Sequence, residues 1–396
     1  MFLVVVILVL SLLHGYVGVR MISPFTVSSL TYTIYWLGIS LLAIAPVSGI
    51  ILRAKGVENT MTDILLWVGY TSLGLFSLAF IIFLIRDIGW LFSLVSSKLM
   101  LLFNGDGQTV EAFNPERRQF LLMSINWGIL GMTSVLGAVG FFQARNLPSV
   151  FRNKITLSRL PKKLEGLRIV QISDLHVGPT IKADYVQKVV AQVNALDPDL
   201  IFFTGDMVDG SVEHLANDVE PIRDLEAKYG KYFVTGNHEY YSGAEFWENK
   251  VTELGIKNLR NEHEIIEING ESLAIAGVTD LMAHQSMKSH RSDPKQAVSG
   301  IPEEMLTLML AHQPGSASQM ETLDIDLMLC GHTHGGQFYP FHLAVAQAHP
   351  YVAGLYQHGN MQVYVNQGTG YWGPPLRLGI PSEITVLELL PETSSS

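Results

Sequence analysis

Residues 168–176 read RIVQISDLH, an apolar run that ends in an Asp-x-His pair. Four further segments share this design, in which imidazole, carboxylate or amide side chains directly follow an apolar run. They are DLIFFTGD (199–206), KYFVTGNHE (231–239), MLTLMLAH (305–312) and DLMLCGHTH (326–334). Continuous apolar runs of this length are typical of strands that are buried on both faces. Because sites in α/β sheets form beyond the carboxyl ends of strands, we expect the five polar endings to converge on one place.

The segments between and after these strands predict the class of the fold. Apolar residues recur at helical spacing over 182–196, and further helices are expected at 213–228 and 244–254. The second half is richer in strands, which are expected at 264–268, 272–278, 361–367 and 383–389. Strands that alternate with helices, followed by a strand-rich half, indicate a layered α/β domain over residues 150–392.

The first 145 residues are mostly apolar and predict a membrane region. A spanning helix needs about 20 mostly apolar residues. The runs that meet this length are 2–18 (only just), 29–52, 64–85 and 120–142. A shorter run at 88–103 contains Lys98 and is either a fifth span or a re-entrant or interfacial piece. Several uncharged runs of this length rarely occur together as core helices of a soluble domain, so residues 1–145 are expected to form a transmembrane region with four or five spans.

Basic residues in the short loops bear on the orientation of these spans. With five spans, Arg53, Lys55, Arg117 and Arg118 share one side, and only Arg20 and Arg86 fall in the opposite loops. The positive-inside rule then leaves the N-terminus in the cytoplasm and the α/β domain outside it. The basic residues just past the last span argue for the opposite orientation; they are Arg145, Arg152 and Lys154. With four spans the rule favours neither side. On the five-span reading, we expect a multi-pass protein of the cell inner membrane with an extracytoplasmic domain.

Charge and cysteine content exclude some classes of function. The formal net charge is −10, which argues against a nucleic-acid-binding surface. Cys330 is the only cysteine, so no intrachain disulfide can form. Neither property indicates an oligomeric state.

The order D-x-H, G-D, G-N-H-E, H and G-H-x-H is similar to that of the calcineurin-like metallophosphoesterase superfamily. The resemblance covers about residues 165–390. NLRNE (258–262), GVTD (277–280) and GPPLR (373–377) resemble the membrane-associated branch that includes the YkuE- and YaeI-like phosphodiesterases. This resemblance implies an αββα domain, in which helices flank a central β-sandwich.

The same resemblance implies a site with two divalent metal ions. Asp174, His176, Asp206 and His334 would hold the first ion, and Asp206, Asn237, His312 and His332 would hold the second. Carboxylate, amide and imidazole ligands suit manganese, iron or zinc. Two such ions lower the pKa of a shared water and neutralise phosphoryl oxygens.

Two further residues match positions in the family that act on the substrate side. His238 resembles the family's general acid, which protonates the leaving oxygen or stabilises the transition state. Asp209 matches the residue that orients this histidine, although an aspartate before Gly210 can also serve only as a turn former.

The expected activity is hydrolysis of a phosphodiester or pyrophosphate, with a lipid-linked or cell-envelope substrate favoured by the membrane anchor. Protein serine/threonine phosphatases carry an arginine where this chain has Gly210, which argues against phosphoprotein substrates. A phosphomonoesterase, a non-catalytic scaffold and a transport or sensing protein are the alternatives. Tyr240, Tyr241, Tyr371 and Trp372 lie beside the motifs and are either core or edge aromatics or an apolar wall for a lipid or nucleoside.

Overall fold

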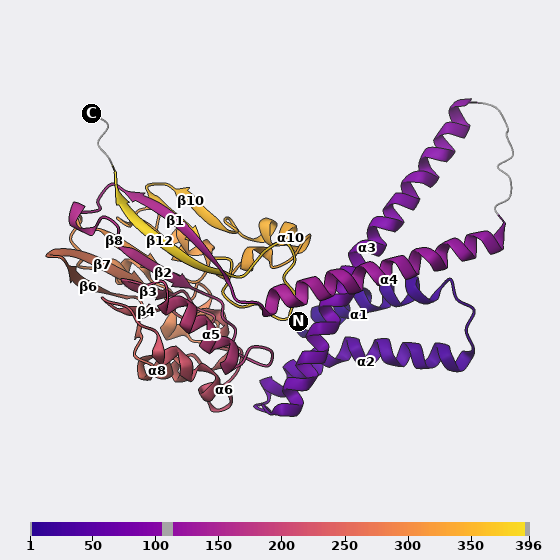
Figure 1. Ribbon diagram of the computed structural model, residues 1–396, viewed down its shortest axis with the longest axis horizontal. Helices are drawn as coiled ribbons and strands as arrows, with labels where there is room; N and C mark the ends of the chain where they lie inside the picture. The colour runs from indigo at the N-terminus through magenta and orange to yellow at the C-terminus, as the bar shows by residue number, and fades with distance from the viewer. Residues whose placement is uncertain (1, 105–113, 393–396) are drawn as a thin grey trace. The chain divides into compact units, whose positions relative to one another are not determined.

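The structure is a computed structural model that describes residues 2–104 and 114–392. It divides into two compact units, Met1–Phe141 and Phe142–Ser396. Figure 1 shows that helices alone build the first unit, whereas the second is built mainly of strands with short helices around them.

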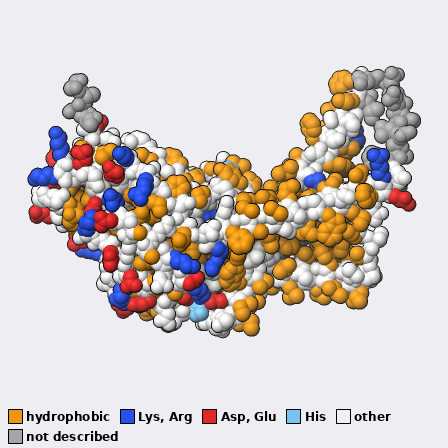
Figure 2. All heavy atoms as spheres, viewed as in Figure 1, with side chains coloured by type: hydrophobic (Ala, Val, Ile, Leu, Met, Phe, Trp, Pro, Cys, Tyr) orange, Lys and Arg blue, Asp and Glu red, His pale blue; other side chains and the backbone are white. Residues whose placement is uncertain are grey.

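Four helices make up the described part of the first unit. They are α1 (Phe2–Ile22), α2 (Ser29–Ala54), α3 (Thr60–Asn104) and α4 (Pro115–Arg145). Each is long and apolar enough to cross a membrane. Large apolar side chains cover their outer surfaces, as Figure 2 shows, whereas charged side chains gather on the second unit. A surface of this kind is stable against lipid and unstable against water, so the helices support membrane association.

The third helix changes the count of expected spans. Residues 64–85 and 88–103 lie in one continuous helix, α3, rather than in two. Its 45 residues extend about 67 Å at 1.5 Å per residue, more than twice the bilayer core of about 30 Å. The described residues therefore form four candidate spans. The assignment of Arg86 to a loop was wrong, because this residue lies within α3.

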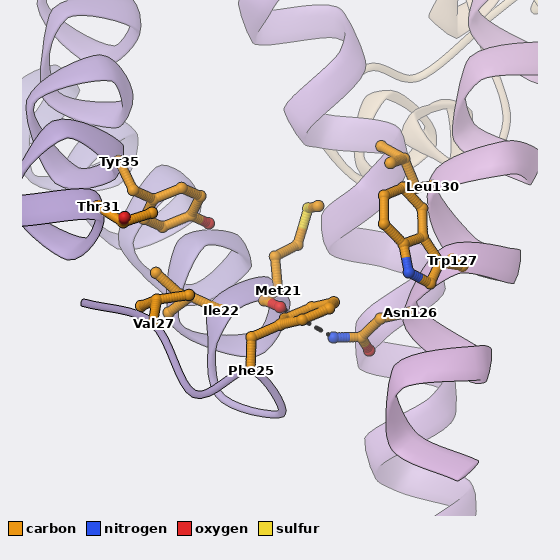
Figure 3. Close-up of a pocket in the computed structure, with 9 residues that line it drawn as sticks. All are labelled: Met21, Ile22, Phe25, Val27, Thr31, Tyr35, Asn126, Trp127 and Leu130. Atoms are coloured by element: carbon orange, nitrogen blue, oxygen red, sulfur yellow. Dashed lines mark hydrogen bonds between the residues drawn. The ribbon is translucent and has the colours of Figure 1, made fainter. Parts of the chain in front are cut away.

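A polar network joins α1, α3 and α4 within the first unit. The Asp87 carboxylate lies 2.7 Å from both Arg20 Nε and Arg86 Nη2, and it accepts a hydrogen bond from Tyr16. Asn126 accepts from Arg86 at 3.0 Å and donates to the Arg20 carbonyl at 2.8 Å. A pocket of about 200 Å³ lies beside Asn126, and its walls are mostly apolar side chains from α1, α2 and α4 and the loop between α1 and α2 (Figure 3).

Two six-stranded sheets form the centre of the second unit. In spatial order, the first contains β1 (Ser149–Leu157), β12 (Glu383–Pro391), β2 (Arg168–Ile172), β3 (Leu200–Phe203), β4 (Lys231–Phe233) and β5 (Lys257–Asn258). The second contains β10 (Gly354–His358), β11 (Met361–Val365), β9 (Leu327–Cys330), β8 (Thr307–Leu310), β7 (Glu271–Gly277) and β6 (Glu262–Ile268). The strands that precede the motifs run parallel to one another within each sheet: β3 pairs with β2 and β4, and β8 pairs with β9.

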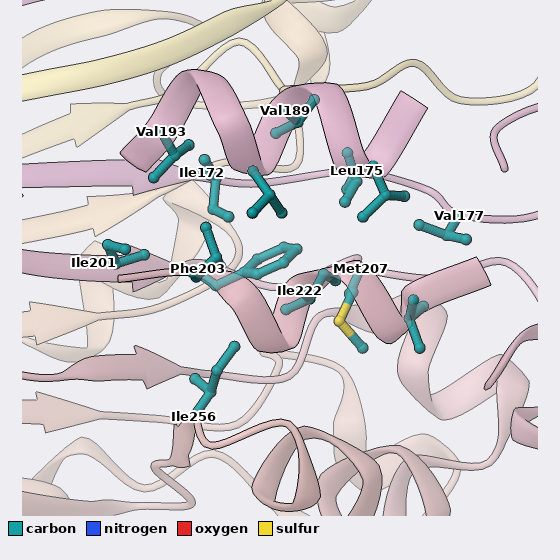
Figure 4. Packing of buried hydrophobic residues seen from close by; sticks show 14 of the residues in the cluster. Ile172, Leu175, Val177, Val189, Val193, Ile201, Phe203, Met207, Ile222 and Ile256 are labelled. Carbon is teal, nitrogen blue, oxygen red and sulfur yellow. The ribbon is translucent and has the colours of Figure 1, made fainter. Parts of the chain in front are cut away.

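Three apolar cores hold the layers together. Side chains such as Ile169, Phe202 and Leu308 fill the space between the two sheets. A second core lies on the outer face of the first sheet, where α5 packs through Val189 and Val193 (Figure 4). A third covers the outer face of the second sheet, beneath α9. The helices of this unit are α5 (Ala183–Asn194), α6 (Val212–Val219), α7 (Asn237–Ser242), α8 (Ala244–Glu253), α9 (Pro294–Val298) and α10 (Phe341–Ala348).

These layers confirm the predicted αββα class, and individual elements differ from the prediction. The helix expected at 213–228 ends at Val219 and continues only as a 3₁₀ turn over Glu220–Asp224. Pro221 explains the end of the α-helix, because its ring excludes the backbone hydrogen bond of the next turn. Strand β1 was not predicted, and it pairs in parallel with β12 along its whole length. Arg152 and Lys154, which were counted as residues flanking a span, lie in this strand.

Candidate dinuclear metal site

The predicted ligands lie at the carboxyl ends of neighbouring strands. Asp174 and His176 follow β2, Asp206 follows β3, and Asn237 is the first residue of α7 after β4. From the second sheet, His312 follows β8, and His332 and His334 follow β9. The structure therefore brings all seven predicted ligands to the same end of the sandwich. All of them except the partly buried His332 are buried.

The first group of donors consists of Asp174, His176 and His334, whose ligand atoms lie within 4.8 Å of one another. The Nε2 atoms of His176 and His334 are 3.0 Å apart. Asp174 Oδ1 lies 3.4 Å from His334 Nε2 and 3.9 Å from His176 Nε2. Two imidazole nitrogens that face each other at this distance need a proton or a cation between them, since both otherwise present lone pairs.

The second group consists of Asp206, His312 and His332. Asp206 Oδ2 is 3.0 Å from His312 Nε2, and His312 Nε2 is 3.1 Å from His332 Nδ1. The same oxygen of Asp206 lies 3.9 Å from His176 Nε2 in the first group. Asp206 therefore stands between the two groups, where one carboxylate can contact two cations.

One unpaired atom provides a further sign that a cation fits here. The Asn237 side-chain oxygen is buried and accepts no hydrogen bond from any described residue. A buried carbonyl without a partner is costly unless another positive group satisfies it. An amide oxygen, carboxylates and imidazoles together form a donor set that suits a divalent transition metal.

The backbone of the site is unusual. Five of the seven predicted ligands have a positive φ: Asp174, His176 and Asp206 at 52°, His334 at 51° and His332 at 72°. Non-glycine residues rarely adopt this left-handed conformation, which costs about 1–3 kcal/mol and concentrates at functional sites. The neighbouring glycines permit the close approach of the loops. A Cβ on Gly205, for example, would lie 2.6 Å from the backbone nitrogen of Gly236.

Several residues behind the ligands fix their orientation. His312 Nδ1 donates to the carbonyl of Thr204 at 2.8 Å, which leaves its Nε2 free to bind a metal. Ser173 Oγ donates to Asp174 at 2.5 Å. The buried Glu239 carboxylate accepts from the backbone amides of Gly236, Asp206 and Met207 at 2.7–3.0 Å, and burial raises its pKa to about 7. Glu239 therefore supports the loops.

His238 and Asp209 lie beside the two groups. His238 Nδ1 contacts the Asp209 carboxylate, and His238 Nε2 is 4.0 Å from Asp206 Oδ2. Asp209 also lies 3.3 Å from His176 Nδ1. Burial alone would lower the pKa of His238, but Asp209 and Asp206 raise it to about 9, so the imidazole carries a proton at neutral pH.

The pKa values of the other titratable ligands shift in both directions. Burial alone would raise the pKa of Asp206, but His312, His238 and His176 hold it well below its usual range. Burial lowers the pKa of His332 to about 3 and that of His334 well below its usual value. Asp206 is therefore ionised and these two imidazoles are neutral, as metal ligation requires. Burial raises the pKa of Asp174, and Asp206 raises the pKa of His312 against the effect of burial.

Comparisons with known proteins agree with this geometry. Residues 167–336 match the family model described as calcineurin-like phosphoesterase. An uncharacterized metallophosphoesterase of Helicobacter pylori is 35% identical over 309 residues, which cover 76% of this chain and 81% of that protein. The chain belongs to the calcineurin-like phosphoesterase family. The uncharacterized metallophosphoesterase YkuE of Bacillus subtilis is 30% identical over 69% of this chain and 97% of its own length.

A further relative is named as a transmembrane protein. The zebrafish "Transmembrane protein with metallophosphoesterase domain" is 37% identical over 266 residues, or 65% of this chain. The aligned region spans 61% of the length of that relative. Similarity to such proteins supports a phosphoesterase with divalent metals and a membrane-associated helical region.

The residues that support the predicted ligands were less visible in the sequence than the ligands themselves. Thr204 acts through a backbone carbonyl, which leaves no signal in side-chain type. Arg377, in the GPPLR segment, is fully buried and donates to the carbonyls of Gln367 and Gly370. Its guanidinium lies 3.2 Å from His334 Nδ1. A single arginine in a glycine- and proline-rich ending gave no reason to expect this contact.

Proposed function

We propose that this protein is a membrane-anchored hydrolase that uses two divalent metal ions to cleave a phosphodiester or a pyrophosphate. The observation that carries the proposal is the position of Asp206 between two groups of buried donors, 3.0 Å from His312 and 3.9 Å from His176. The four spans favour a substrate that itself resides in a membrane.

The two groups of donors define the proposed ion sites. Asp174, His176, Asp206 and His334 would hold the first ion, and Asp206, Asn237, His312 and His332 would hold the second. Mn²⁺, Fe or Zn²⁺ suits these ligands. When bound, the pair would supply hydroxide at neutral pH and offset the charge of the phosphoryl oxygens.

His238 and Asp209 carry the proton chemistry in this proposal. His238 holds a proton at neutral pH and would donate it from Nε2 to the leaving oxygen. Asp209 contacts Nδ1 of the same ring, so it fixes the orientation of the imidazole and keeps Nε2 directed toward Asp206.

The residue at position 210 favours a diester over a monoester. Gly210 donates through its backbone to Ser242 Oγ at 3.1 Å, and its carbonyl accepts from Trp247 Nε1 at 2.9 Å. Gly210 therefore stabilises the loop through its backbone hydrogen bonds, and it offers no guanidinium to a dianionic phosphoryl group. A diester carries one negative charge and has less need of an additional cation.

An assay of the purified full chain tests this function. We expect hydrolysis of bis(p-nitrophenyl) phosphate with added Mn²⁺ or Zn²⁺, at a kcat/KM at least about tenfold above that for p-nitrophenyl phosphate, since one extra charge-assisted contact contributes about 1.5–3 kcal/mol. A preference for the monoester would contradict the diester assignment. Absence of turnover with both esters, in a chain that holds two metals, would contradict the hydrolase itself.

A further inference from the structure

Five large apolar side chains are exposed around the metal site. Their exposed fractions are 72% for Tyr241, 51% for Tyr339, 49% for Phe341, 61% for Leu343 and 50% for Trp372. We refer to these five residues as the apolar rim. Soluble surfaces seldom gather so many large apolar groups in one place without a ligand or partner.

Two rim residues contact the proposed general acid. The His238 ring lies 5.3 Å from the ring of Tyr241 and 5.8 Å from that of Trp372, with edge-to-face geometry in both pairs. Tyr240 and Tyr371, their neighbours in the chain, are partly or fully buried. Of the four aromatics noted in the sequence, the structure thus exposes the two that flank His238.

The other three rim residues lie on a segment that begins and ends at the metal-binding loop. This segment leaves the loop at Gln337 and carries α10, which has no buried residue. It returns where the His349 ring lies 5.1 Å from that of His332 and where the Val352 carbonyl accepts from Thr333 Oγ1 at 2.6 Å. Both ends of the exposed apolar helix are therefore fixed beside proposed metal ligands.

The buried side chain of Gln337 links the segment that carries α10 to the loop that carries Trp372. Gln337 accepts from the backbone amide of Trp372 and donates to its carbonyl, each at 3.0 Å. These two bonds fix the backbone of Trp372, and its indole is half exposed. The segment with α10 and the loop with Trp372 thus form one surface.

The loop that carries Trp372 is also anchored where the chain leaves its fourth span. Tyr371 is buried and donates to the Thr180 carbonyl at 3.2 Å, and Arg145 donates to the same carbonyl at 2.6 Å. Ala144, in the last turn of α4, shares an apolar core with Tyr371. All of these contacts lie within the unit Phe142–Ser396. The rim is therefore built on the residues that follow the apolar run 120–142.

We propose that the apolar rim binds the acyl chain of a membrane lipid whose phosphodiester is hydrolysed at the metal site. This inference rests on the proposed hydrolase function and adds the class of its substrate. A chain of methylenes matches a rim without charged side chains, and the candidate spans of the same chain favour a substrate that lies in a membrane. Each methylene that the rim removes from water contributes about a fourfold gain in affinity.

The test uses p-nitrophenyl phosphodiesters that share one leaving group and differ only in the second ester, which is methyl, butyl, octyl or 5′-thymidyl. The full chain is purified in amphipol, and kcat/KM is measured for each ester. Burial of three or four methylenes predicts an octyl-to-methyl ratio on the order of 10² for the natural chain. Trp372→Ala and the double variant Phe341→Ser/Leu343→Ser should each lower that ratio at least about tenfold.

Ile265→Ser provides the matched control, because Ile265 is an exposed apolar residue on β6, at the edge of the second sheet. Its ratio should equal that of the natural chain. Equal kcat/KM for methyl and octyl esters would overturn the rim proposal and leave the hydrolase intact. Preference for the thymidyl ester would likewise overturn it and assign the rim to a nucleobase. Failure to cleave any ester with two metals bound would overturn the hydrolase and the rim together.

Discussion

At the scale of single residues, the carboxylate of Asp209 lies close to two histidines of the site. It was expected to orient His238, and it does contact Nδ1 of that ring. It also lies 3.3 Å from Nδ1 of His176, a proposed metal ligand. The Asp209 carboxylate therefore contacts the proposed acid and lies close to a proposed ligand, although His176 Nδ1 forms no hydrogen bond with any described residue. The spacing of residues in the sequence could not reveal the second contact, because it depends on the left-handed backbone of His176.

The role of His238 is tested by its dependence on the leaving group. His238→Ala should lower kcat about 10²–10⁴-fold for a diester with an alkyl leaving group, because the leaving alkoxide then departs without a proton. For p-nitrophenolate, which leaves readily as an anion, the loss should be much smaller. His284→Ala, at an exposed histidine outside the motifs, serves as the control. An equal loss for both leaving groups would exclude proton donation by His238.

At the scale of elements, the site depends on loops that approach one another closely at the ends of strands. Gly331 follows β9, and a Cβ at this position would contact Ser173 and the Asp174 carboxylate, with Ser173 Cβ at 2.9 Å. The glycines of the Gly-Asp, Gly-Asn and Gly-His motifs thus allow ligands from both sheets to meet. These glycines are therefore required for the close packing of the loops, in addition to marking turns.

Gly331→Ala should weaken the site without removing any ligand. The added methyl must displace Ser173 or Asp174, at a cost of about 1–3 kcal/mol typical of overpacking. We expect at least about tenfold weaker metal binding in a competition titration with a chelator. Gly315→Ala, where the added methyl meets only the side chain of Leu281 at 3.3 Å, should bind metal normally. Unchanged metal affinity in Gly331→Ala would show that the loops accommodate the added methyl without displacing Ser173 or Asp174.

The sequence predicted the buried strands that precede the motifs far better than the elements outside the core, such as β1 and α10. Continuous apolar runs marked β2, β3, β8 and β9, because these strands are buried on both faces. Strand β1 reads SVFRNKITL and was missed, because its charged residues conceal the alternating burial of an edge strand. Helix α10 was missed as well, because it covers no core and has no amphipathic pattern.

At the scale of the whole molecule, the number of spans determines whether the unit Phe142–Ser396 lies on the same side of the membrane as the N-terminus. The expectation of an extracytoplasmic domain depended on a fifth span at 88–103, which the structure joins to α3. The sequence alone could not resolve this point, because both parts of α3 are apolar and only Arg86 and Asp87 separate them. An even number of crossings returns the chain to its starting side.

Four spans therefore predict that the N-terminus and residue 396 lie on the same side of the membrane. Alkaline phosphatase and green fluorescent protein are fused in turn to each terminus of the full chain. Both termini should give the same pair of signals, whichever reporter is active. Opposite signals at the two termini would require an odd number of spans.

The most direct test of the central claim concerns Asp206, the carboxylate between the two groups of donors. Metal content by mass spectrometry and the rate of bis(p-nitrophenyl) phosphate hydrolysis are measured on the same samples of the natural chain and of Asp206→Asn. Asp224→Asn, at an exposed position, is the control. A neutral amide cannot offset two cations, so we predict two ions per chain in the natural protein and in the control, and loss of metal together with turnover in Asp206→Asn. Two retained ions with a near-normal rate in Asp206→Asn would contradict the dinuclear site.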